Sequence, residues 1–162
     1  MHNTKKSQIF TTDFFIAFFI FSVLLIITMI SWNDYNSKLE KNIESDILET
    51  KAFQISNVLV KSEGSPTNWD YDDVLVIGLA EFDRILSIDK VNSFVSFPIN
   101  KTNDLLQTHN FNFSFILKET DGDIIFDYGY NISNPKRSVS VRRYVVYNNA
   151  EAIAEFNLWE NK

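Results

Sequence analysis

The sequence predicts an α+β protein, in which a long N-terminal helix packs on a mostly antiparallel β-sheet head. An unbroken apolar run near the N-terminus is followed by a stretch with helical periodicity that contains neither proline nor glycine. Beyond residue 64 the pattern changes to short apolar or alternating segments separated by turn residues. We therefore expect a helix over 8–63, with a transmembrane first half and an amphipathic second half, and a head over 64–162.

The first half of the helix is almost entirely apolar. Between Phe14 and Ile30 every residue is apolar except Ser22 and Thr28, whose hydroxyls can bond back to the preceding helical turn. A helix over 14–32 is about 28 Å long, close to the ~30 Å thickness of a bilayer hydrocarbon core. The sequence therefore predicts one membrane span at 14–32, in contact with membrane lipid.

Charges on either side of this span predict its orientation. Lys5 and Lys6 precede the span, and the single acid before it is Asp13. The net charge of the whole chain is −6, and the other Lys, Arg, Asp and Glu residues follow the span with acids in excess. Because basic residues stay on the cytoplasmic side, we expect a single-pass cell-membrane protein with a cytoplasmic N-terminus and an extracytoplasmic C-terminal domain.

The residues ahead of the span suggest proteolytic processing. Lys5-Lys6-Ser7-Gln8 stands shortly before Asp13 and the apolar run. This arrangement resembles the N-terminus of an archaeal type IV pilin-like precursor with a class III signal peptide. The resemblance implies that a prepilin-type peptidase removes residues 1–7 as a cytoplasmic leader. Lys6 and Ser7 would then precede the cut, and Gln8 would begin the mature chain.

Two features depart from the usual pattern of that family. Ser7 stands where the family usually has glycine or alanine, and Asp13 would be sixth in the mature chain where the family's acid is usually fifth. An uncut signal-anchor, in which Asp13 caps the helix, is therefore a second interpretation. In the pilin interpretation Asp13 would instead pair with the new α-amino group of Gln8 in a neighbouring subunit.

The second half of the helix follows the span without a break. Residues 33–62 contain no helix-breaking residue, and Lys61, Gly64 and Pro66 together mark the end of the helix. Apolar residues recur at helical intervals and predict the stripe that packs on the sheet: Tyr35, Leu39, Ile43, Ile47, Ala52, Ile55 and Leu59.

The head is predicted element by element from local patterns. Ser87 precedes a helix that Pro98 ends, and Asp121-Gly122 is a hairpin turn. The expected elements are a buried strand over 72–79, a helix over 88–97, a strand containing Phe111, Phe113 and Phe115, a strand over 124–127, and strands over 138–147 and 151–159.

Several head segments are similar, in order and spacing, to uncharacterised archaeal membrane-anchored pilin-like proteins. They are Gly64-Ser65-Pro66-Thr67-Asn68-Trp69, Ile77-Gly78-Leu79-Ala80, Leu86-Ser87-Ile88-Asp89-Lys90 and the terminal strands ending at Trp159. The resemblance implies an envelope location and carries no catalytic residues.

Composition excludes several kinds of chemistry. The chain has no cysteine, and its four glycines are not spaced for a phosphate-binding loop. Its acidic balance argues against nucleic acid as a partner. His109 is the one histidine outside the cytoplasmic tip, and it lies in an Asn-rich stretch expected to be a loop. We therefore expect no enzyme and no cofactor; an anchored hydrolase is the remaining alternative.

Two kinds of surface site are weaker candidates. Asp121, Asp123 and Asp127 could supply oxygen ligands to Ca²⁺, although turn chemistry also explains Asp121-Gly122. Asn100 and Asn131 each begin an Asn-x-Ser/Thr sequon and are candidate glycosylation sites, whereas the sequon at Asn112 lies in a predicted strand.

The predicted function is that of a pilin-like structural subunit, major or minor, of an archaeal surface filament or secretion-type assembly. Its partners would be membrane lipid, the prepilin-type peptidase and like or related pilin subunits, in a homo- or hetero-oligomer. The alternative is an uncleaved, single-pass extracytoplasmic binding domain. Removal of residues 1–7 separates the two.

Overall fold

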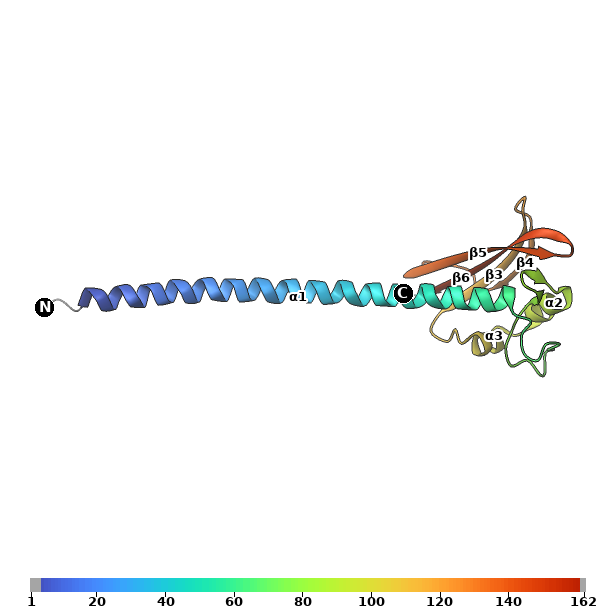
Figure 1. The fold of residues 1–162 in the computed structure, drawn as a ribbon, viewed down its shortest axis with the longest axis horizontal. Helices are drawn as coiled ribbons and strands as arrows, with labels where there is room; N and C mark the ends of the chain where they lie inside the picture. The colour runs from blue at the N-terminus through green and yellow to red at the C-terminus, as the bar shows by residue number, and fades with distance from the viewer. Residues whose placement is uncertain (1–3, 161–162) are drawn as a thin grey trace. The chain divides into compact units, whose positions relative to one another are not determined.

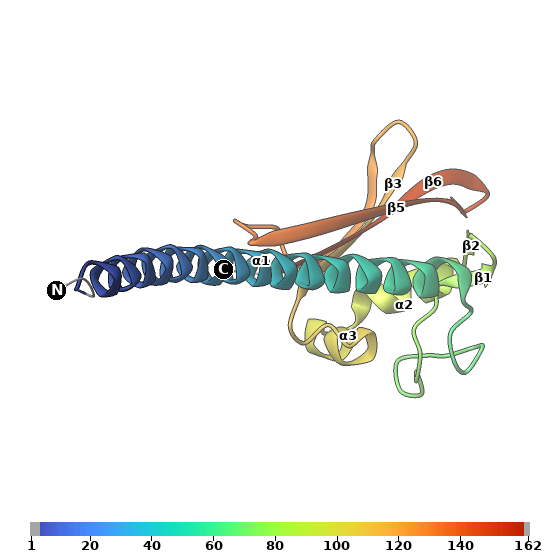
Figure 2. The same cartoon turned by 60° about the vertical axis from the view of Figure 1, so that its left-hand side comes forward.

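The computed structural model describes the backbone of residues 4–160 and the side chains of residues 12–160. The chain divides into two compact units, Met1–Glu44 and Ser45–Lys162. The elements are α1 (Thr4–Lys61), β1 (Ala80–Phe82), β2 (Ile85–Leu86), α2 (Ile88–Ser96), α3 (Ile99–Leu106), β3 (Asn112–Glu119), β4 (Ile124–Gly129), β5 (Arg137–Tyr147) and β6 (Ala150–Glu160); Figure 1 shows the arrangement, and Figure 2 labels β1 and β2.

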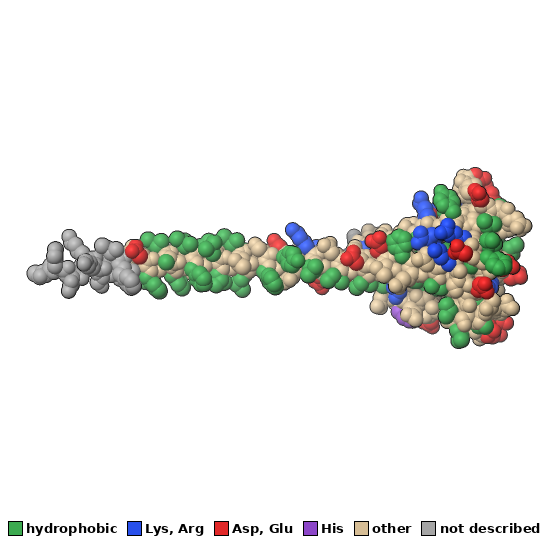
Figure 3. Space-filling model, viewed as in Figure 1, with side chains coloured by type: hydrophobic (Ala, Val, Ile, Leu, Met, Phe, Trp, Pro, Cys, Tyr) green, Lys and Arg blue, Asp and Glu red, His purple; other side chains and the backbone are tan. Residues whose placement is uncertain are grey.

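In the first unit the described structure is the N-terminal part of α1. Its side chains from Thr12 to Glu44 are exposed, apart from the partly buried Ser22. Apolar side chains extend along much of this part of the helix (Figure 3). Helix formation here satisfies the backbone hydrogen bonds within the element itself, which is the requirement for a segment that meets lipid.

The second unit contains a six-stranded sheet in the order β1-β2-β5-β6-β3-β4. All neighbouring strands are antiparallel except β2 and β5, which pair in parallel at Ile85–Val146 and Leu86–Tyr147. Asn148 and Asn149 make the tight turn between β5 and β6 with positive φ angles of 52° and 59°, as two-residue hairpins require. The α+β fold with a mostly antiparallel sheet is confirmed, as are the predicted hairpins.

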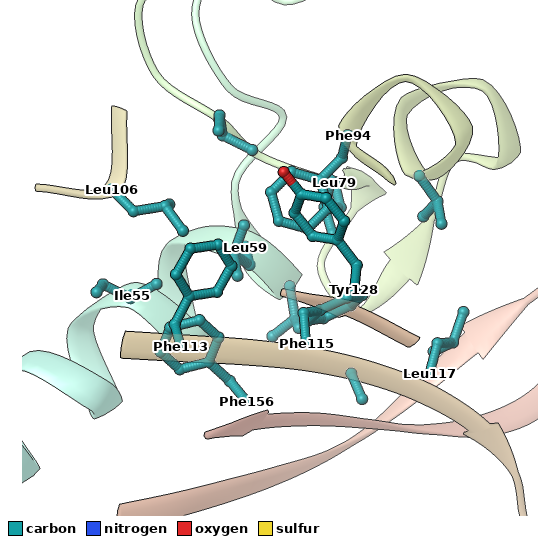
Figure 4. Close-up of a cluster of buried hydrophobic side chains, with 14 of the residues drawn as sticks. Ile55, Leu59, Leu79, Phe94, Leu106, Phe113, Phe115, Leu117, Tyr128 and Phe156 are labelled. Atoms are coloured by element: carbon teal, nitrogen blue, oxygen red, sulfur yellow. The ribbon is translucent and has the colours of Figure 1, made fainter. Parts of the chain in front are cut away.

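The core lies between this sheet and the helices of the second unit, which cover one face of it (Figures 1 and 2). Figure 4 shows Ile55 and Leu59 of α1 facing Phe113 and Phe156 of the central strands. The buried positions of α1 are three to four residues apart, so they form one face of the helix: Leu48, Ala52, Ile55 and Leu59.

The predicted stripe on α1 is only half correct. Leu39, Ile43 and Ile47 expose 44%, 50% and 53% of their surface, and packing begins at Leu48. Leu39 and Ile43 lie in the first unit, which holds only helix where it is described, so they have no second element to pack against within that unit. Ile47 belongs to the second unit but lies outside the buried face of the helix.

The predicted strand over 72–79 is wrong. Within that range the structure describes a single isolated bridge, between Ser65 and Val76. The backbone instead bonds to the preceding loop and to the end of α1, since Leu75 N–H donates to Ser65 O and Leu79 N–H donates to Leu59 O, each at 2.8 Å. These bonds hold the loop against the helix end and so leave no strand partner.

The helix α2 is confirmed with Ser87 at its N-cap position, but α3 was missed. Pro98 does end α2, and it is also the residue from which α3 begins. His109 does lie in a turn beyond α3, as expected, but no element was expected over 99–106, where asparagine is a weak helix former. Packing outweighs that preference, since Thr102 and Leu106 are buried against the sheet.

Candidate functional site

The feature with the clearest functional meaning is the apolar segment of α1. Its most apolar 18-residue window has a mean hydropathy of 2.8, and none of that window is buried. By length and composition, this helix could cross a membrane. The hydroxyls of Ser22 and Thr28 donate to the carbonyls of Phe18 and Leu24 at 2.8 Å, so the two polar side chains in the segment are satisfied within the helix.

The predicted processing site lies outside the residues whose side chains are described. That applies to Lys6, Ser7 and Gln8; their backbone belongs to α1, which begins at Thr4. Asp13 is exposed and lies inside the helix rather than at its N-cap. The capping role considered for Asp13 is therefore wrong for this chain, because the helix begins before Asp13, at Thr4.

The acidic clusters are occupied by turn hydrogen bonds. Asp70 Oδ1 accepts from the N–H of Asp72 at 2.9 Å and of Asp73 at 3.3 Å, and the bond from Asp72 is the main reason that the pKa of Asp70 is lowered. Asp121 Oδ1 likewise accepts from Asp123 N–H at 3.3 Å.

The calcium candidates do not form a common site. Asp127 lies on β4 opposite Ile116 of β3, whereas Asp121 and Asp123 belong to the turn before that strand. Across the described part of the chain, no three His, Cys, Asp or Glu side chains are grouped to hold a metal ion. His109 is exposed and pairs with Asp104 at 3.5 Å.

An ion cluster lies on the sheet face opposite the helices. Glu155 of β6 is buried, and its carboxylate accepts from Lys118 Nζ at 2.7 Å and from Arg142 Nε at 2.9 Å. Ser140 Oγ donates to the same carboxylate at 3.3 Å. The signal in the sequence was that the charged residues of β5 are basic and those of β6 acidic, but only the register of three strands shows which of them meet.

The cluster sets the ionisation of Glu155. Burial alone raises the pKa of a carboxyl group, but the hydrogen bond from Lys118 and the charges of Lys118 and Arg142 outweigh it, so the pKa of Glu155 is lowered. A lowered folded-state pKa stabilises the fold above the ordinary value of about 4.3 and loses that contribution as pH falls through the folded value.

Replacing Glu155 should therefore destabilise the head in a pH-dependent way. We expect Glu155→Gln to cost about 2 kcal/mol at pH 7, because two cations lose a charged acceptor. The difference from the parent should shrink below about pH 4, where the parent carboxylate also becomes protonated. Thermal unfolding at pH 7 and pH 3 measures both values.

The control for this variant is Glu160→Gln, which removes the more exposed ion pair with Lys136. Exposed pairs are worth about 0–1 kcal/mol, so its effect should be small at both pH values. An equal loss of stability in the two variants would contradict a special role for Glu155.

The remaining predicted sites lie apart from one another on the head. Asn100 on α3 and Asn131 after β4 are exposed, whereas Asn112 is partly buried in β3. A surface pocket of about 290 Å³ lies beside β2 and β5 and includes Arg84, Tyr144 and Glu151. The pocket shares no residue with the predicted sites.

The chain was compared with protein-family models, with curated proteins and with solved structures, and none of the three comparisons finds a match. The described part of the chain shows an α+β fold with one helix apolar enough to span a membrane.

Proposed function

We propose that this chain is a pilin-like structural subunit, anchored in the membrane by its N-terminal hydrophobic helix. The observation that carries the proposal is that the two ends of α1 differ in character. The helix contains an exposed apolar segment long enough to cross a bilayer, and its last turns supply Leu48, Ile55 and Leu59 to the core of the head. One element thus provides both the anchor and part of the fold.

The sequence resemblance supports a more specific form of this proposal. It indicates an archaeal surface filament or secretion-type assembly, with a head outside the cytoplasm. Removal of residues 1–7 would create an α-amino group at Gln8, which is cationic near neutral pH. A carboxylate within an apolar helix is costly unless it is paired. Asp13 of a neighbouring subunit would supply the partner, and each pair would link two subunits.

A second candidate function is supported by a different observation. Ser7 and the position of Asp13 depart from the usual pattern of a processed precursor, and a chain that is not processed keeps residues 1–7. In that case the chain is a single-pass protein whose head binds a ligand or another protein outside the cytoplasm. Both functions need the same membrane span, and they differ in the fate of residues 1–7.

The assembly role of Asp13 is tested by Asp13→Asn, which keeps the size and polarity of the side chain and removes its charge. We expect the variant to be processed and inserted like the parent. We also expect it to be absent from assemblies, since removing one partner of a buried ion pair costs about 3–5 kcal/mol. The measurement is the amount of each chain in sheared surface material and in the membrane fraction.

The matched control is Asp34→Asn, which removes a charge beyond the apolar segment of the same helix. It should enter assemblies normally. Normal recovery of Asp13→Asn in sheared filaments, or the absence of filaments in the parent, would contradict the assembly role and favour the uncut anchored domain.

A further inference from the structure

Strand β5 has a free backbone edge over most of its length. It pairs with β6 from Arg137 to Tyr147, but with β2 only at Val146 and Tyr147. Val146 N–H donates to Arg84 O at 2.8 Å, on the side away from β6. Successive residues of a strand direct their backbone groups to opposite sides. The N–H and C=O groups of Ser140 and Arg142 therefore point to the same free side, where no other described strand pairs with them.

Strand β4 forms the opposite edge of the sheet. Tyr130, just after this strand, donates its N–H to Phe113 O of β3 at 2.8 Å. By the same alternation, the backbone groups of Asp127 and Gly129 point away from β3. Asp127 is exposed and is the only charged residue of this described strand. Strand β4, at one end of the strand order, and the part of β5 that β2 does not pair with thus both present unpaired backbone groups.

The directions of the strands make these two edges compatible. The pairs β5–β6, β6–β3 and β3–β4 are all antiparallel, so β4 runs opposite to β5. A second copy placed beside the first, in the same orientation, would add its β4 to β5 as an antiparallel neighbour. Antiparallel pairing is the slightly more stable of the two ladder types.

The side chains are compatible as well. Cross-strand neighbours share a face of a sheet, and the register places Asp127, Ile116, Glu155 and Arg142 in one row across four strands. Asp127 and Arg142 therefore lie on the same face, and both direct their backbone groups outward. In a β4–β5 contact between two copies, Asp127 of one copy can lie directly opposite Arg142 of the other and form an ion pair.

The charges of the strands favour this β4–β5 contact over a symmetric contact between two β5 strands. The charged residues of β5 are all basic, whereas the charge on β4 is acidic. Two β5 edges would bring like charges together, which is unfavourable across strands. The side chain of Arg142 is 67% exposed although its Nε binds Glu155, so its guanidinium remains accessible to a second carboxylate.

We propose that a second copy of this chain docks its β4 edge on the free edge of β5, with Asp127 opposite Arg142. This inference rests on the proposed assembly function and names the contact between heads. The contact joins two different surfaces, so it repeats from copy to copy in a ring or an open filament. It is short, because a bulge interrupts β4 beside Ile124. Anchoring in one membrane raises the effective concentration that such a short contact needs.

Disulfide trapping tests the contact in the full chain, which has no native cysteine. The double variant Asp127→Cys/Arg142→Cys is reconstituted in phosphatidylcholine vesicles and oxidised. Opposite residues of a hydrogen-bonded antiparallel pair have Cα atoms about 5.5 Å apart, within disulfide range. We expect a ladder of dimers, trimers and larger species on a non-reducing gel.

The matched control is Asp104→Cys/Arg142→Cys, which replaces another exposed acid, on α3. It should give no ladder, and a ladder in both variants would overturn the proposal as random collision. A mixture of the two single variants, Asp127→Cys and Arg142→Cys, should give a dimer, whereas each single variant alone should stay monomeric. Dimers of a single variant would indicate a symmetric contact and overturn the proposal.

A second variant tests the ion pair without cysteine in the contact. Asp127→Lys, measured by chemical cross-linking of the same vesicles, should lower the yield of linked heads about fivefold, because an opposite-charge pair becomes a like-charge pair. Asp104→Lys should leave the yield unchanged. Equal yields for the two variants would overturn the Asp127–Arg142 pairing.

The inference and the proposed function fail in different ways. If no ladder forms while assemblies that depend on Asp13 are recovered, the edge contact is overturned and the proposed function stands. If the double-cysteine variant forms no ladder and the parent chain forms no assembly, both are overturned.

Discussion

A chain that begins at Gly64 is expected to be unfolded and to aggregate, whereas a chain that begins at Ser45 is expected to fold. The difference between them is the last part of α1, which supplies Leu48, Ile55, Leu59 and Val60 to the core. Burying each such side chain contributes about 1.5–3 kcal/mol. Their joint loss is comparable to the whole stability of a domain, about 5–15 kcal/mol.

The truncation also exposes the apolar side chains of the sheet that pack against α1, and large exposed apolar patches cause aggregation. Heteronuclear NMR spectra of the two truncated chains provide the measurement. A third chain, beginning at Asn33, is the control: because Leu39 and Ile43 are exposed, keeping them should add little stability over the chain from Ser45. A well-dispersed spectrum from the chain that begins at Gly64 would show that the helix is not part of the core.

The second large effect is expected at Gly78, where the loop before β1 crosses the end of α1. A Cβ atom at this position would lie 2.2 Å from Ser62 O and 2.3 Å from Gly64 N, which are both backbone atoms. The same residue accepts a hydrogen bond from Trp69 Nε1 at 2.9 Å through its carbonyl. Gly78→Ala must therefore displace backbone, and we expect it to lower the free energy of unfolding by about 3 kcal/mol.

The control for this substitution is Gly122→Ala in the β3–β4 turn. No atom lies within 4 Å of a Cβ there, but φ is +106°, so strain alone should cost about 1 kcal/mol. Chemical denaturation of both variants gives the two free energies. A smaller effect at Gly78 than at Gly122 would contradict the close contact between the loop and the helix end.

Much of the fold follows from local pattern. Strands β3 to β6 were predictable because each of their signals is contained in a few neighbouring residues. The signals are the alternation around Phe113 and Phe115, the turn at Asp121-Gly122 and the alternating runs before and after Asn148. The end of α1 at Lys61 is also local, since glycine and proline follow it directly.

The errors arise where distant contacts decide the structure. The apolar run at 72–79 resembles a strand, but its backbone bonds go to the end of α1 and to the preceding loop. Thr102 and Leu106 become helical because they pack on the sheet, and Tyr128 Oη lies 2.6 Å from Thr102 Oγ1. Neither partner is visible in the local sequence.

The candidate sites were predictable to different degrees. The apolar segment could be identified from composition alone, because membrane length and hydropathy are properties of a continuous run. The cluster at Glu155 could not, since Lys118 and Arg142 come from two other strands and meet it only through the register. The free edges of β4 and β5 likewise depend on the strand order.

The central claim is that this chain is an anchored, processed subunit, and the intact mass of the protein tests it most directly. The chain is recovered from membranes of cells with an active prepilin peptidase and measured by mass spectrometry. The account predicts a mass lower by residues 1–7, with Gln8 as the first residue. A membrane-bound chain that retains Met1–Ser7 would contradict processing and leave the uncut anchored domain as the function.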